Sequence, residues 1–207
     1  NSNLEPTSAE KAPVEDPLDV KIVTLENGLT VYLSENHEEP RIAARTVVRA
    51  GGAQDDPKAT GMAHYLEHML ANKGTTKLGT KDYASEKPLL DEIRTAYDEL
   101  FETNDPTERE QLYARIDELG QKANEFTIAN ELKQAFGVLG GRGFNAFTSR
   151  DQTAYVVDIP SNKLEPWAVL EGDRFSNAVF RSFQTEVETV YEEKNRALDN
   201  AQRQLYD

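Results

Sequence analysis

The most informative stretch of this sequence is residues 61–70, which read GMAHYLEHML. On a helix, at about 100° per residue, His64, Glu67 and His68 fall within one arc of about 100°, and the apolar side chains occupy the opposite side. Two imidazoles four residues apart can therefore hold one metal ion, with a carboxylate beside them. A bare pair of histidines is more often two ordinary surface or core residues, but Glu67 on the same face favours a metal site. The pattern predicts a helix over about 58–71.

A further ligand must come from elsewhere in the chain, because a catalytic zinc site typically has three protein ligands and one open position. The chain has no Cys and three His, and the third, His37, lies in a polar turn where we expect it to be solvated. The remaining ligand should then be a carboxylate. A helix expected over 184–205 offers Glu186 and Glu193, two turns apart at the edge of its apolar face. Either could face the metal, or both could be boundary residues of an amphipathic helix.

The composition excludes several classes of protein. The 207 residues are 38% hydrophobic and 29% charged, and no apolar stretch approaches the roughly 18 residues that a membrane span needs. We therefore expect no membrane span. The net charge of −14 argues against nucleic acid as a partner, since such binders need a basic face. Without Cys there is no thiol catalysis, and no Gly-x-Ser-x-Gly elbow indicates a serine hydrolase.

The first residues differ in character from the rest. They carry Pro6, Pro13 and Pro17 among small and acidic residues, with almost nothing to bury, so we interpret residues 1–19 as a disordered lead-in. They lack the basic-then-apolar pattern of a signal peptide. The absence of Cys and this lead-in favour a bacterial periplasm or cell envelope, with the cytoplasm as the alternative.

The segment 86–133 holds much of the negative charge, with thirteen acidic and six basic residues. Apolar residues recur every three or four positions in two runs, which predicts two helices laid side by side as an acidic helical hairpin. Between them, Asp105 is the expected N-cap, Pro106 the first helical residue and Glu108 the residue that completes a capping box. The charge fits a solvated outer face, and the alternative is a docking surface for a basic partner.

Strand patterns flank these helices. Residues 20–33 alternate around Asn27-Gly28, the strongest short-range signal of a β-hairpin. We expect three more strands and one more helix, over 42–50, 144–148, 153–159 and 163–180. This order predicts an α+β fold for residues 20–207, with a mixed, mainly antiparallel sheet and helices packed on one face.

Four short motifs follow one another along the chain. They are Gly51-Gly52 before an acidic loop, residues 61–70 followed by Lys73-Gly74-Thr75, residues 145–155 (NAFTSRDQTAY), and the segment from Glu186 to Glu193. His-x-x-Glu-His is the inverted zinc motif of the inverzincins. Over residues 20–200 the set resembles the insulinase, pitrilysin and mitochondrial processing peptidase family of zinc metallopeptidases, M16. The resemblance implies the LuxS/MPP-like metallopeptidase half-fold, with the acidic hairpin as an insertion.

The resemblance also implies a role for each matching residue. His64 and His68 would be zinc ligands, Glu67 the general base, Glu193 the distal ligand, and Glu186 an acidic residue that supports the site without ligating. Substrate peptides would add a strand along Asn145, Ala146 and Phe147. Two features depart from the pattern: the distal glutamate lies farther from the histidines than in compact members, which the hairpin at 86–133 accounts for, and Ala71-Asn72 replaces a common aromatic residue.

The function implied is that of a zinc-dependent endopeptidase acting on unstructured peptides or oligopeptides. The chain matches the N-terminal, metal-carrying half of the family, so we expect it to need a second half, in cis or in trans. The alternative is a non-catalytic or incomplete subunit that acts as an interaction module, for which the acidic hairpin would be the docking element. The intact set of ligands and base argues for the enzyme.

Overall fold

The computed structural model describes residues 18–198, which fall into two units that divide after Pro40. In the first unit, β1 (Lys21–Thr24) and β2 (Thr30–Leu33) form an antiparallel hairpin. Gly28 turns the chain with a φ of 86°, and the Asn27 side chain accepts a hydrogen bond from the Leu29 N–H. The predicted hairpin is confirmed, whereas the predicted lead-in over 1–19 lies almost wholly outside the described residues.

The second unit is built on a three-stranded sheet. Its strands are β3 (Arg41–Val48), β5 (Thr153–Pro160) and β4 (Arg142–Thr148), in the order β3-β5-β4. Every strand pairing within residues 18–198 is antiparallel, where the sequence favoured a mixed, mainly antiparallel sheet. The short turn between β4 and β5 forces that pair to be antiparallel. Because β4 lies at the edge, its outer side has no strand partner among the described residues.

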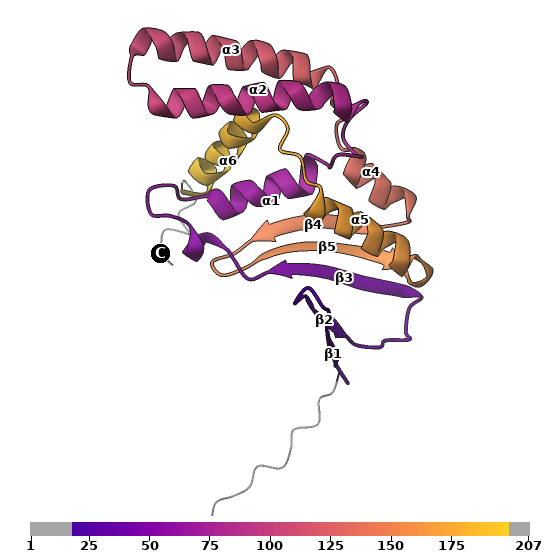
Figure 1. Ribbon diagram of the computed structural model, residues 1–207. Helices are drawn as coiled ribbons and strands as arrows, with labels where there is room; N and C mark the ends of the chain where they lie inside the picture. Colours follow the sequence, from indigo (N-terminus) through magenta and orange to yellow (C-terminus); the bar gives the residue numbers. More distant parts are fainter. Residues whose placement is uncertain (1–17, 199–207) are drawn as a thin grey trace, which may run out of the picture. The chain divides into compact units, whose positions relative to one another are not determined.

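Helices cover one face of this sheet, as predicted (Figure 1). α1 (Met62–Asn72), α4 (Glu131–Val138) and α5 (Leu164–Ser176) contact its strands. The strand residues that face the helices alternate along each strand, as the period of two requires. The core between the layers consists of Ala44, Leu132, Phe136, Val157 and Ile159.

The acidic segment forms the predicted pair of helices, α2 (Tyr83–Glu102) and α3 (Pro106–Asn124). Their seam buries Ala96, Leu100, Leu112 and Ile116. Figure 1 shows the two helices side by side, beyond α6 (Phe183–Leu198). Their exposed sides carry most of the acidic residues, which is consistent with a solvated face.

The N-terminus of α3 differs from the prediction in one detail. Asp105 is the N-cap and accepts from the N–H groups of Thr107 and Glu108, each at 2.9 Å. The predicted capping box is incomplete: the Asp105 N–H does not donate to the Glu108 carboxylate, because the hydroxyl of Thr103 lies between these two groups. Thr103 donates to the Glu108 carboxylate and accepts from the Asp105 N–H.

The two helices that carry the motif residues pack against each other. Tyr65 and Met69 of α1 form a buried cluster with Val190 of α6. α1 begins at Met62 rather than at the predicted residue 58, because Asp55 caps it from the preceding loop: its carboxylate accepts from the N–H groups of Gly61 and Ala63, at 2.7 and 2.8 Å. The part of the predicted last helix beyond residue 198 lies outside the described residues. No helix between residues 18 and 198 combines the length and apolarity that crossing a membrane requires.

Candidate metal centre

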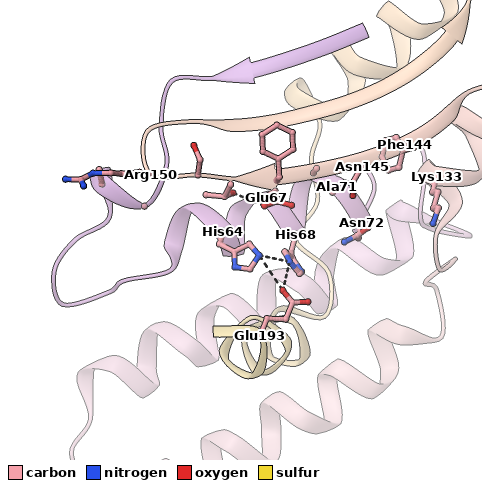
Figure 2. Close-up of a pocket in the computed structure, with 16 residues that line it drawn as sticks. His64, Glu67, His68, Ala71, Asn72, Lys133, Phe144, Asn145, Arg150 and Glu193 are labelled. Carbon is pink, nitrogen blue, oxygen red and sulfur yellow. Dashed lines mark hydrogen bonds and ion pairs between the residues drawn. The ribbon is translucent and has the colours of Figure 1, made fainter. Parts of the chain in front are cut away.

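His64 and His68 lie one turn apart on α1, and their Nε2 atoms are 3.1 Å apart. The Oε2 atom of Glu193, on α6, is 3.5 Å from the Nε2 of His64 and 3.4 Å from that of His68. Figure 2 shows the three side chains converging from the two helices. The period of α1 therefore places the two imidazoles together, and the packing of α6 on α1 brings the carboxylate to them.

The spacing of these three atoms fits a metal ion. In a tetrahedral zinc site with bonds of about 2.0–2.1 Å, neighbouring ligand atoms are about 3.3–3.4 Å apart. The three observed distances, from 3.1 to 3.5 Å, bracket that value. The imidazole and carboxylate donors are also those that zinc accepts. Two of the three side chains remain partly exposed, His64 at 35% and Glu193 at 44%, so a ligand could reach the cluster from the cleft.

Glu186 lies on the same helix as Glu193 but faces a different atom. Its Oε1 is 2.7 Å from the Nδ1 of His68, and its Oε2 forms an ion pair with Lys73. A carboxylate at this position accepts the Nδ1 proton, which leaves the Nε2 lone pair of His68 directed at the cluster. Burial raises the pKa of Glu186, but hydrogen bonds from Lys73 and His68 outweigh it and hold the pKa below its usual range.

Glu67 is buried behind the cluster, with 6% of its surface exposed. The hydroxyl of Thr148, on β4, donates to its Oε2 at 2.8 Å. Thr148 also lies 3.3 Å from the hydroxyl of Thr153, which donates to the Ala50 carbonyl at 2.9 Å. Within residues 18–198 the Oε1 atom of Glu67 accepts no hydrogen bond. Thr148 thus holds the Oε2 atom of Glu67, and the Oε1 atom is available to accept a proton.

The cluster of His64, His68 and Glu193 opens into a cleft of about 1090 Å³ between α1 and β4. The predicted substrate residues all line it: Asn145 and Phe147 are exposed, whereas Ala146 is half-buried and faces the helices. The turn at the end of β4 is fixed by Gly52 and Ala53, whose N–H groups donate to the carbonyls of Ser149 and Arg150. Gly51 permits this approach, since a Cβ there would lie 2.3 Å from the Ser149 oxygen.

The structure therefore brings together most of the residues that the sequence singled out. His64, His68 and Glu193 form one cluster, Glu67 and Glu186 adjoin it, and His37 is 89% exposed in the first unit, as expected. Thr148 and Lys73 stand within the motifs of the sequence, but no role is predicted for either from the sequence alone. The period of β4 could have identified Thr148, because it shares a face with Ala146, whereas nothing local connects Lys73 with Glu186.

The sequence is similar to known proteins in two comparisons. The sequence model described as Insulinase (Peptidase family M16) matches residues 30–90. The chain is 26% identical over 151 residues to the protein named Probable zinc protease PqqL of Escherichia coli (strain K12), a match that covers 71% of this chain and 11% of that protein.

Two solved structures share the fold. A protease from Helicobacter pylori matches with a TM-score of 0.57 and 20% identity, over 87% of this chain and 32% of that one. The first half of the periplasmic protease PqqL from Escherichia coli matches with a TM-score of 0.55 and 21% identity, over 88% of this chain and 30% of that one. This chain spans about a third of each.

The fold is thus the one found in the first half of PqqL and in part of the Helicobacter pylori protease. In sequence, the chain is similar to the insulinase family, peptidase family M16, over residues 30–90 and to PqqL over 151 residues. The relative in Escherichia coli is named a probable zinc protease, and the His-His-Glu cluster is where this chain could hold a metal ion.

Proposed function

We propose that this chain is the metal-carrying half of a zinc-dependent endopeptidase, with His64, His68 and Glu193 as the zinc ligands. The observation that carries the proposal is the convergence of two Nε2 atoms and one carboxylate oxygen within 3.5 Å of one another. Glu186 is the less suitable ligand, because both of its oxygens are engaged, one by His68 and one by Lys73.

The chemistry follows from the positions of the side chains. When bound, zinc would supply Lewis acidity, which lowers the pKa of a bound water toward about 7 and polarises a peptide carbonyl. Glu67 is the general base: its free Oε1 takes the proton from the attacking water and later delivers it to the leaving nitrogen. Thr148 holds the other oxygen of Glu67, so that the base keeps its orientation. Glu186 orients His68 and maintains its tautomer.

The substrates we propose are unstructured peptides. The outer edge of β4 offers unpaired backbone groups along Asn145, Ala146 and Phe147, and an extended peptide can pair with such an edge through its own backbone. An unstructured peptide is free to adopt this extended form, whereas most strands of a folded protein are already paired. The cleft beside β4 is open, which is consistent with a second half, in cis or in trans, that would cover it. The description of PqqL as a periplasmic protease supports the periplasm as the compartment, with the cytoplasm as the alternative.

A non-catalytic or incomplete subunit is the second candidate. It is favoured by the exposed acidic residues of α2 and α3, which a basic partner could contact. The ligand set and the buried Glu67 favour the enzyme, because a scaffold has no need of an oriented carboxylate next to a metal cluster.

Zinc content and cleavage of an unstructured peptide test the proposal together. We expect one zinc per chain, about a tenfold or greater loss of zinc affinity in Glu193→Gln, and retained zinc with cleavage abolished in Glu67→Gln. Glu188→Gln serves as a control, because Glu188 is exposed on the same helix as Glu193. A folded chain that binds no zinc would favour the interaction module, and undiminished cleavage by Glu67→Gln would refute the role of the base.

A further inference from the structure

Two basic side chains lie at opposite ends of the cleft. Lys133 projects from α4 at one end, Arg150 lies in the turn after β4 at the other, and His64 and His68 are between them (Figure 2). Both are exposed. Neither forms an ion pair with any residue between 18 and 198, although many other basic residues in this range do. The two cations are therefore available to a molecule that occupies the cleft.

The charge of the cleft differs from that of the chain. The charged residues that line it are Glu67, Glu193, Lys133 and Arg150, so the lining is balanced in the absence of a metal ion. A divalent ion at the cluster would give the cleft an excess of two positive charges. The whole chain carries −14. The negative surface of the chain would repel an acidic ligand, whereas the metal-loaded cleft would attract it. This difference in charge would favour acidic ligands at the cleft alone.

The edge strand gives the direction in which a ligand would lie. A peptide paired with β4 runs along the cleft and advances by about 3.3 Å per residue. Its central residues would lie beside the metal cluster, and residues on either side would pass Lys133 and Arg150. The two cations would then meet different ends of the same peptide.

We propose that Lys133 and Arg150 are specificity-determining residues, which select extended peptides carrying Asp or Glu on both sides of the segment held at the metal cluster. The inference rests on the proposed function, because it places the peptide in the same cleft. It goes further by naming the class of substrate. Each contact is an exposed ion pair, so the preference should be modest, about three- to tenfold in affinity, and should weaken at high salt.

Peptide binding tests this without relying on turnover. The zinc-loaded Glu67→Gln chain would be titrated with two labelled ten-residue peptides that have blocked ends and the same uncharged centre. One carries two Asp residues at each end, and the other carries Asn at those four positions. Fluorescence anisotropy at about 50 mM and about 500 mM salt gives the affinities, across a range in which Debye screening changes strongly. Lys133→Gln and Arg150→Gln are then compared with Arg45→Gln, which removes an exposed charge from β3, on the far side of β5.

The proposal predicts tighter binding of the Asp peptide at low salt, a preference reduced about two- to threefold by each cleft substitution and unchanged by Arg45→Gln. Equal binding of the two peptides, a preference insensitive to Lys133 and Arg150, or no peptide binding at all would overturn it. Parallel cleavage assays with the wild-type chain keep the two questions separate. If the wild-type chain cleaves neither peptide even when a second half is supplied, but the Asp preference depends on Lys133 and Arg150, the inference stands and the proposed activity fails.

Discussion

Thr148 connects the edge of the sheet to the proposed general base. Its hydroxyl has one proton, and the 2.8 Å contact directs that proton to Glu67. The neighbouring Thr153 hydroxyl donates its own proton to the carbonyl of Ala50. A peptide that added to β4, as proposed, would pair with the backbone of the same strand whose side chain contacts Glu67.

Removing this hydroxyl should slow turnover without weakening substrate binding. A hydrogen bond to a charged group contributes about 1.5–3 kcal/mol, so we expect Thr148→Val, which keeps the shape of the side chain, to lower kcat by about ten- to a hundredfold with KM nearly unchanged. Steady-state kinetics on one peptide measure both constants. Thr148→Ser retains the hydroxyl and should restore most of the rate. A zinc-loaded Thr148→Val chain with wild-type kcat would show that Thr148 has no such role.

A buried ion pair ties the segment before α6 to α2, and hydrogen bonds tie the same segment to the loop after α1. Arg181 lies just before α6 and contacts Glu86 of α2 through two hydrogen bonds, of 2.7 and 2.9 Å. Its guanidinium also donates to the carbonyls of Lys73 and Thr75, at 2.8 and 2.9 Å. Both charged side chains are almost fully buried. This network fixes where α6 begins relative to the end of α1, and hence where Glu186 and Glu193 lie.

Breaking the pair should destabilise the second unit strongly. Glu86→Gln leaves a buried guanidinium without its counter-charge, a change that typically costs about 3–5 kcal/mol. Urea unfolding followed by circular dichroism measures the free energy of unfolding. The matched control is Glu118→Gln, which removes the partner of Lys122 in an exposed pair on α3 and should have no measurable effect. A similar stability for both variants would contradict the structural role of Arg181.

At the scale of the molecule, the cleft beside β4 is open and the chain spans about a third of the similar proteases. We therefore expect full activity to require a second half that encloses the peptide. Groups that stabilise the developing negative charge in the transition state contribute about 100- to 1000-fold each. Cleavage by the zinc-loaded chain should rise by at least about a hundredfold when a second half is supplied in cis or in trans. Equal rates with and without it would show that this chain is catalytically self-sufficient.

Much of the site could be predicted because its signals are local. The spacing of His64, Glu67 and His68 is a property of one helix, and the alternation in residues 142–148 is a property of one strand. The predicted start of α1 was wrong because its cap, Asp55, lies in the preceding loop. The predicted capping box of α3 was wrong because Thr103, which lies outside the motif, accepts from the Asp105 N–H in place of the Glu108 carboxylate.

The two candidate glutamates show where the sequence stops being informative. Glu186 and Glu193 are seven residues apart, so they differ by only about 20° around the helix and share one stripe. Periodicity cannot separate them. They lie about 10 Å apart along the helix axis. The position of α6 along α1 therefore decides which of them lies beside the two Nε2 atoms. Local spacing alone therefore determines the two imidazoles and the base, whereas the carboxylate that completes the cluster is selected by long-range packing, through Tyr65, Met69 and Val190 and the Arg181 network.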